Sequence, residues 1–208
     1  MHVPPGPDVY GTVSAYMDGT GRISDAGMLW KEEYQERFLE IIRPYSDTIE
    51  ACFAGHTHMD EYRILYYEDG AASETILISP SISPQFGNNP GFKVFTVSTS
   101  DWELQDYRSM VYPFDVADPA FETYYAFSSA YGLSGPLGQA LNQLVPELVS
   151  DEVRRGNYTH FYYSGHDGGN PISDTNWPAY WCATHSMSKK AYVECVNTYP
   201  YPATFLRP

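Results

Sequence analysis

One amphipathic helix followed by five short apolar runs is the feature that most constrains how this chain can fold. Residues 31–43 place apolar side chains at positions i, i+4, i+7 and i+8, which predicts a helix with one buried face. Runs of β-branched and aromatic residues then predict strands at 48–54, 62–67, 75–78, 92–97 and 102–107. A helix that precedes several strands linked by turns indicates a mixed α/β (α+β) fold in which the helix covers a sheet.

The rest of the chain has a different character. Residues 1–28 are rich in Gly, Pro and Asp without a sustained period, so we expect an extended loop there. Beyond residue 112, helical periodicity is expected at 121–131, 137–149 and 181–196. The sequence therefore predicts a core over 1–112 and a helical C-terminal subdomain over 113–208. An Asp-Gly pair at 69–70 predicts a hairpin turn, and residues 87–91 predict a longer loop.

The charge balance excludes two classes of partner. The chain has 12 Lys plus Arg against 26 Asp plus Glu, a formal charge of −14, so a basic surface for nucleic acid cannot be built. An anionic membrane surface would repel the chain as well. No run of apolar residues is long enough for a transmembrane helix.

Two features indicate an oxidising, glycosylating compartment. Asn157 begins an Asn-Tyr-Thr sequon, and Cys182 and Cys195 lie near each other in the sequence. We therefore predict a secreted or lysosomal/vacuolar protein that is glycosylated at Asn157. No signal peptide is visible at the start of the chain, and we expect one to lie upstream.

The strongest chemical signal is Gly-His-Thr-His at residues 55–58, directly after an apolar run. A strand that ends in a Gly turn would hold His56 and His58 on a rigid edge, where both imidazoles can reach one metal centre. Imidazole suits zinc and other borderline divalent metals. The alternative is that the two histidines are ordinary polar residues at an exposed turn.

Two further segments complete a pattern. His2 begins the sequence His-Val-Pro-Pro-Gly, and Asn88 and Asn89 precede Pro-Gly-Phe. Together with Gly-His-Thr-His and the following Asp-Glu-Tyr at 60–62, these motifs resemble in order and spacing the C-terminal half of a calcineurin-like metallophosphoesterase. The acid sphingomyelinase-like phosphodiesterase branch is the most similar.

This resemblance implies a fold and a set of site residues. The fold would be the downstream half of a β-sandwich flanked by helices, with a helical tail. A dinuclear centre of two divalent metal ions, zinc in this branch, would be held by His2 and His56 on one ion and His58 on the other. Asn88 and Asn89 would lie near the substrate entrance. Cys182 and Cys195 would form a disulfide.

The resemblance also implies what the chain lacks. The carboxylate ligands of this family precede the Pro-Pro-Gly motif, and two divalent ions without anionic ligands would repel each other. We therefore expect the parent protein to be a metal-dependent phosphodiesterase, and this chain alone to be an incomplete catalyst. The isolated chain would either be prone to aggregation or pair with a complementary upstream fragment.

Several alternatives stay open. The substrate would be a phosphodiester small molecule or a phospholipid head group, with sphingomyelin as the named candidate and nucleotides or polyphosphate as alternatives. The competing reading is a non-catalytic fragment that serves as a binding or structural module.

Overall fold

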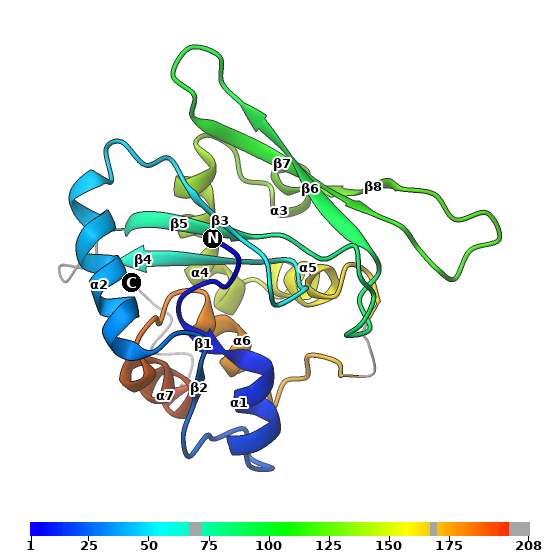
Figure 1. Cartoon of the computed structure of the whole chain (residues 1–208). Helices are drawn as coiled ribbons and strands as arrows, with labels where there is room; N and C mark the ends of the chain where they lie inside the picture. Colours follow the sequence, from blue (N-terminus) through cyan, green and yellow to red (C-terminus); the bar gives the residue numbers. More distant parts are fainter. Residues whose placement is uncertain (67–71, 167–169, 200–208) are drawn as a thin grey trace.

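A computed structural model describes residues 1–66, 72–166 and 170–199. In this part of the chain the strands form two three-stranded sheets and one two-stranded ribbon, and helices pack around them (Figure 1). The described strands form no closed barrel. This arrangement confirms the mixed α/β (α+β) class.

The first sheet has the order β3-β5-β4. Strand β3 (Cys52–Ala54) runs parallel to β5 (Ala72–Ile78), and β4 (Glu61–Tyr66) runs antiparallel to β5. The protein has a large hydrophobic core, called the principal core below, and a smaller one, and alternate residues of β5 pack into each. Ile76 and Ile78 belong to the smaller core beneath helix α2 (Glu32–Ile42), whereas Leu77 belongs to the principal core. The sheet is therefore covered on both faces, because α4 (Leu137–Ser150) supplies Leu141, Leu144 and Leu148 to the principal core.

The second sheet, β6-β7-β8, is joined to the first by a buried ion pair. It consists of β6 (Gly91–Val97), β7 (Leu104–Val111) and β8 (Glu122–Ala126), all antiparallel. Lys93 on β6 lies 2.6 Å from Asp60, and its ammonium also donates to the carbonyls of Glu61 and Ile78. Both charged side chains are almost fully buried, so this contact fixes how the two sheets meet.

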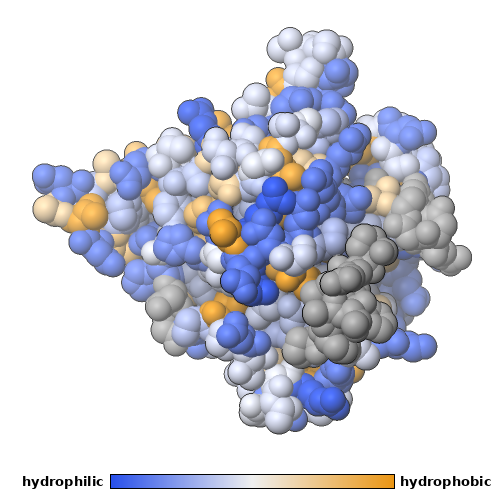
Figure 2. All heavy atoms as spheres, turned by 180° about the vertical axis from the view of Figure 1, so that it is seen from behind, coloured by the Kyte–Doolittle hydropathy of each residue, from blue (hydrophilic) through white to orange (hydrophobic). Residues whose placement is uncertain are grey.

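The remaining elements surround these sheets (Figure 1). They are β1 (Pro7–Asp8), α1 (Val9–Tyr16), β2 (Gly27–Met28), η1 (Arg43–Tyr45), α3 (Phe127–Tyr131), α5 (Glu152–Tyr162), α6 (Trp177–Ala183) and α7 (Lys189–Thr198). In the described part of the chain no helix is long and apolar enough to cross a membrane. Figure 2 shows mostly hydrophilic residues on the face seen from behind, with hydrophobic ones in small separate groups.

The helix at 31–43 and the five strands are confirmed, with shifts of a few residues at their ends. Three expectations are wrong. Residues 1–28 contain α1, which begins where the Asp8 carboxylate accepts a hydrogen bond from the Gly11 amide. The stretch 121–131 is helical only in its second half, α3, while its first half is β8, because those residues pair with β7. The stretch 181–196 is two helices, α6 and α7, and Ser188 caps the second.

Two other expectations need separate comment. The turn at 69–70 lies outside the described residues, although β4 and β5 pair antiparallel on either side of it. The principal core draws residues from both sides of position 112, and β7 pairs with β8 across it. The division at 112 stays a prediction from the sequence.

Candidate metal centre and adjoining cavity

The Gly-His-Thr-His turn leaves β3 at Ala54 and meets the N-terminal segment of the chain. The Gly55 amide donates to the carbonyl of His2 over 2.9 Å. This contact brings the two rings together: His56 Nδ1 lies 3.4 Å from His2 Nε2, and the ring planes cross at 84°. Two imidazoles that are 54 positions apart in the sequence therefore converge at the end of one strand.

Both histidines of the turn have strained backbones. His56 has φ of 70° and His58 has φ of 69°, values in the left-handed region that side chains other than Gly rarely adopt. In the described part of the chain only Trp102 and Ser164 share this feature among non-Gly residues. Strain of this kind costs about 1–3 kcal/mol and concentrates at functional sites, which favours a functional role for this turn.

The ring of His58 packs against that of Phe86, with 4.8 Å between the two ring centroids. Its Nδ1 is buried and makes no hydrogen bond to any described residue. Burial lowers the pKa of His58, as do the nearby His56 and His2, while a hydrogen bond to the Ser83 backbone opposes this shift. A neutral imidazole with a spare nitrogen is the form that binds a metal ion.

These residues fit part of a metal centre. His2 and His56 present nitrogens to a common point, and His58 has an unsatisfied nitrogen. Within the described residues, however, no group of three or more His, Cys, Asp or Glu lies close enough to hold a metal ion. The three imidazoles carry no negative charge, so anionic ligands for two divalent ions would have to come from elsewhere.

Asn88 and Asn89, the predicted substrate contacts, are both buried. The Asn88 amide nitrogen donates to backbone carbonyls of its own loop, and that of Asn89 donates to the Ser164 carbonyl. Asn88 Oδ1 has no partner among the described residues. Neither side chain lines the cavity described below, and their role toward a substrate stays a prediction.

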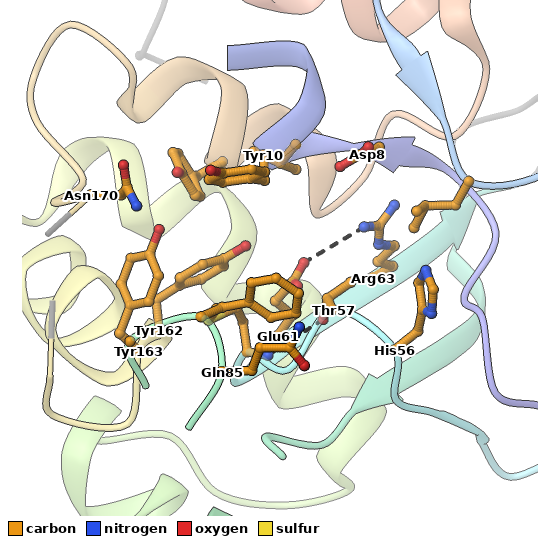
Figure 3. A pocket seen from close by; sticks show the side chains of 16 residues that line it. Asp8, Tyr10, His56, Thr57, Glu61, Arg63, Gln85, Tyr162, Tyr163 and Asn170 are labelled. Carbon is orange, nitrogen blue, oxygen red and sulfur yellow. Dashed lines mark hydrogen bonds and ion pairs between the residues drawn. The ribbon is translucent and has the colours of Figure 1, made fainter. Parts of the chain in front are cut away.

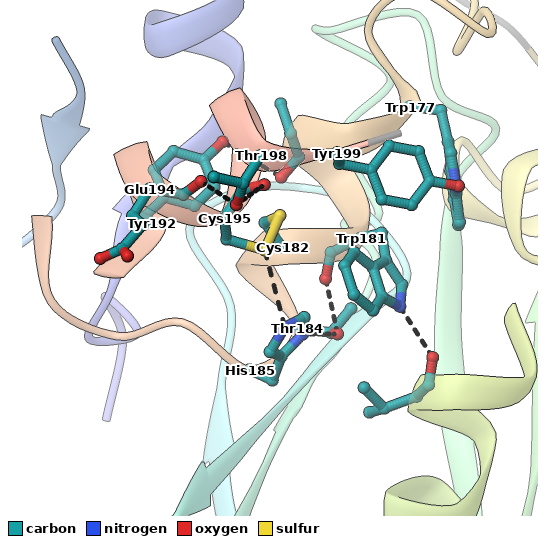
Figure 4. Close-up of a disulfide and its surroundings, with 12 residues drawn as sticks. Trp177, Trp181, Cys182, Thr184, His185, Tyr192, Glu194, Cys195, Thr198 and Tyr199 are labelled. Carbon is teal, nitrogen blue, oxygen red and sulfur yellow. Dashed lines mark hydrogen bonds between the residues drawn. A yellow bond between two sulfur atoms is a disulfide. The ribbon is translucent and has the colours of Figure 1, made fainter. Parts of the chain in front are cut away.

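The predicted disulfide between Cys182 and Cys195 is present and joins α6 to α7 (Figure 4). His185 lies beside it, with Nε2 3.7 Å from the Cys195 sulfur, and burial lowers the pKa of His185 to about 4. The predicted glycosylation residue, Asn157, lies in α5, where its side-chain nitrogen donates to the Ala130 carbonyl. Glycosylation at Asn157 stays a prediction.

A cavity of about 350 Å³ adjoins the histidine turn (Figure 3). His56 and Thr57 form one border of it. The opposite walls come from the N-terminal segment, the loop at 85–87 and the end of α5. Two charged residues of β4, Glu61 and Arg63, line the cavity and point toward one another.

Neither Glu61 nor Arg63 was predicted from the sequence to have a role at the site. The sequence did contain a signal: both charged residues occur, two positions apart, in a strand that is otherwise apolar and aromatic. Charged side chains are rarely fully buried, yet Glu61 is 4% exposed and Arg63 is 1% exposed.

Arg63 holds the segment that carries His2. Its guanidinium donates to the carbonyls of Pro5 and Pro7 over 3.1 and 3.0 Å. Gly6, between them, has φ of 102°, and a Cβ there would meet an Arg63 nitrogen at 2.4 Å. The Pro-Pro-Gly motif therefore needs glycine because the chain passes this close to Arg63 in a left-handed conformation.

Comparison with known proteins yields similar relatives. The chain is 30% identical over 174 residues to sphingomyelinase phosphodiesterase D of Dictyostelium discoideum, which covers 77% of this chain and 36% of that protein. It is 24% identical over 178 residues to the rat cyclic GMP-AMP phosphodiesterase SMPDL3A, covering 80% of the chain and 40% of the relative. Human acid sphingomyelinase-like phosphodiesterase 3b is 23% identical over 189 residues, covering 83% and 41%.

The chain is a homologue of the acid sphingomyelinase-like phosphodiesterases. This result confirms the resemblance drawn from its motifs. No family model matches the chain. The chain spans about two fifths or less of the length of these relatives.

Proposed function

We propose that this chain supplies one half of the active site of a metal-dependent phosphodiesterase, corresponding to the C-terminal part of the catalytic core of its relatives. His2 and His56 would bind one divalent ion and His58 the second, with zinc as the metal. The observation that carries this proposal is the 3.4 Å approach of His2 and His56 at a strained turn, in a homologue of named phosphodiesterases.

The residues of the chain would divide the work between binding and positioning. Bound divalent ions supply positive charge for the phosphoryl oxygens and lower the pKa of a bound water. Arg63 keeps the His2 segment in place through two backbone carbonyls, and the Gly55 amide ties the same segment to the turn. Since no described group of three or more His, Cys, Asp or Glu could hold a metal ion, the carboxylate ligands would come from another segment or a partner chain.

We propose a phosphodiester small molecule or a phospholipid head group as the substrate. Sphingomyelin and cyclic dinucleotides are both represented in the names of the relatives. A secreted or lysosomal location is supported by the Cys182–Cys195 disulfide, since such bonds persist in oxidising compartments.

Zinc titration of the purified chain tests the proposal, with calorimetry as the readout. We expect His56→Ala and His58→Ala each to weaken zinc binding by at least about tenfold, because altering a residue that only supports a ligand already costs about 10- to 100-fold. His160→Ala is the matched control, since His160 is an exposed histidine of α5 outside the turn. Equal zinc affinity in all four proteins would overturn the proposed ligand set.

A further inference from the structure

The segment that carries His2 has a single backbone donor over residues 4–7. Three of these four residues are prolines, which have no N–H group, so the Gly6 amide is the only donor of the stretch, and all four residues are buried. The Gly6 amide donates to Oε1 of Gln35 over 2.5 Å. Because a buried amide without a partner is costly, Gln35 stabilises the buried path that this segment takes.

Gln35 is a buried polar residue in α2. It is 3% exposed, although its sequence neighbours Tyr34 and Glu36 are exposed. The other end of its amide is also in use, since Nε2 donates to the Met187 carbonyl over 2.8 Å. Glutamine suits this position because it accepts one hydrogen bond and donates another. An ionised glutamate could only accept, and an apolar side chain of the same length could do neither.

Met187 lies in a loop that is itself held firmly. The Cys182–Cys195 disulfide closes the stretch that contains it (Figure 4). The Ile64 amide of β4 donates to the Thr184 carbonyl of the same stretch over 2.7 Å. Met187 is also buried in the smaller core, which receives the last residue of β3. One end of the Gln35 amide is therefore tied to a fixed part of the fold and the other to the segment that carries His2.

We propose that Gln35 is a positioning residue of the candidate metal centre. It ties the His2 segment to the disulfide-closed loop at 182–195 and so holds the His2 ring beside that of His56. Arg63 and the Gly55 amide link the same segment to the first sheet, whereas Gln35 links it to the helical tail. The metal-binding role of the histidines rests on the proposed function, but the placement of their rings does not.

The test uses Gln35→Met in the full chain, which nearly keeps the length of the side chain and removes both hydrogen bonds. In metal-free protein we expect loss of the nuclear Overhauser effect between the ring protons of His2 and His56. Zinc affinity, measured by calorimetry, should fall about tenfold, the lower end of the range for a residue that supports a ligand. Gln143→Met makes the same change at an exposed position of α4 and should retain both signals.

Ile76→Val separates positioning from a general loss of stability. It removes one methylene from the smaller core and should lower the free energy of unfolding in urea, with the ring contact and the zinc affinity unchanged. If Gln35→Met is too unstable to study, hydrogen exchange in the wild-type chain decides, because the Gly6 amide is the only one in residues 4–7 and should be strongly protected.

Two results would overturn the proposal. One is a ring contact and a zinc affinity that are both unchanged in Gln35→Met. The other is a Gly6 amide that exchanges as fast as in an unfolded peptide. If the wild-type chain fails to bind zinc while Gln35→Met still abolishes the ring contact, the ligand set is refuted and the positioning role of Gln35 stands.

Discussion

Glu74 should make the stability of this protein depend on pH. Glu74 lies on β5, on the same face of the strand as Ile76 and Ile78. Its side chain is buried, with 4% of the residue exposed, and its Oε1 has no hydrogen-bond partner among the described residues. Burial, and then the charge of Glu50, raises the pKa of Glu74 from 4.5 to about 7. The perturbation we propose is Glu74→Gln, which removes the ionisable group and keeps its size.

The sign follows from proton linkage. Because the pKa of Glu74 is higher in the folded state, the folded protein holds its proton more tightly than the unfolded chain. The contribution of Glu74 to stability is therefore fully present below pH 4.5 and is lost as pH rises toward about 7. The full difference corresponds to at most about 3 kcal/mol at 1.36 kcal/mol per pH unit. Since Glu50 is exposed and its charge is screened by salt, we expect about 1–3 kcal/mol.

Urea unfolding at pH 5, 6, 7 and 8, followed by circular dichroism, measures the effect. His185 acts in the opposite direction, because its pKa of about 4 removes stability as pH falls from 6.5. The informative quantity is therefore the difference in unfolding free energy between Glu74→Gln and wild type, which should shift in favour of the variant from pH 5 to pH 8. The exposed Glu36→Gln is the control and should follow wild type. Parallel pH profiles for wild type and Glu74→Gln would refute the reasoning.

Three other perturbations test the packing. Lys93→Met leaves the Asp60 carboxylate buried without its cation and should destabilise the fold by about 3–5 kcal/mol in urea unfolding; a loss below 1 kcal/mol would contradict a buried pair. Cys182→Ser combined with Cys195→Ser opens a short loop and should cost about 2–4 kcal/mol, measured under non-reducing conditions against wild type. Gly6→Ala should displace the Arg63 side chain and lower the melting temperature, whereas Gly19→Ala, where a Cβ meets nothing within 4 Å, should lower it far less.

Secondary-structure elements were predicted correctly where the local hydrophobic pattern matches the way the element packs in the fold. The helix at 31–43 has a clear apolar face and acidic residues in its first turn, so it forms as expected. α1 was missed because it contains Gly and β-branched residues and buries only Val9 and Thr12. β8 has a composition compatible with helix or strand, and only its pairing with β7 decides between them.

The candidate site was predictable in part for similar reasons. A strand that ends in Gly-His-Thr-His places His56 and His58 by local geometry alone. The approach of His2 was expected only through family resemblance, since it depends on the Gly55 amide and on Arg63, contacts that join residues more than 50 positions apart. The cavity could not be predicted, because its walls come from segments that meet only after folding.

Two neighbouring acids where β4 begins are satisfied to very different degrees. Asp60 and Glu61 are adjacent and equally buried. Asp60 is fully satisfied, with contacts of 2.6, 3.0 and 2.9 Å to side chains of all three strands of the second sheet, Lys93, Ser109 and Tyr125. Glu61 has one contact of 3.6 Å and a free oxygen. The acid just before β4 is thus fully satisfied, and its contacts join the two sheets. The Glu61 carboxylate, at the first position of β4, keeps an oxygen that no described residue uses, so burial of this acid is offset only in part.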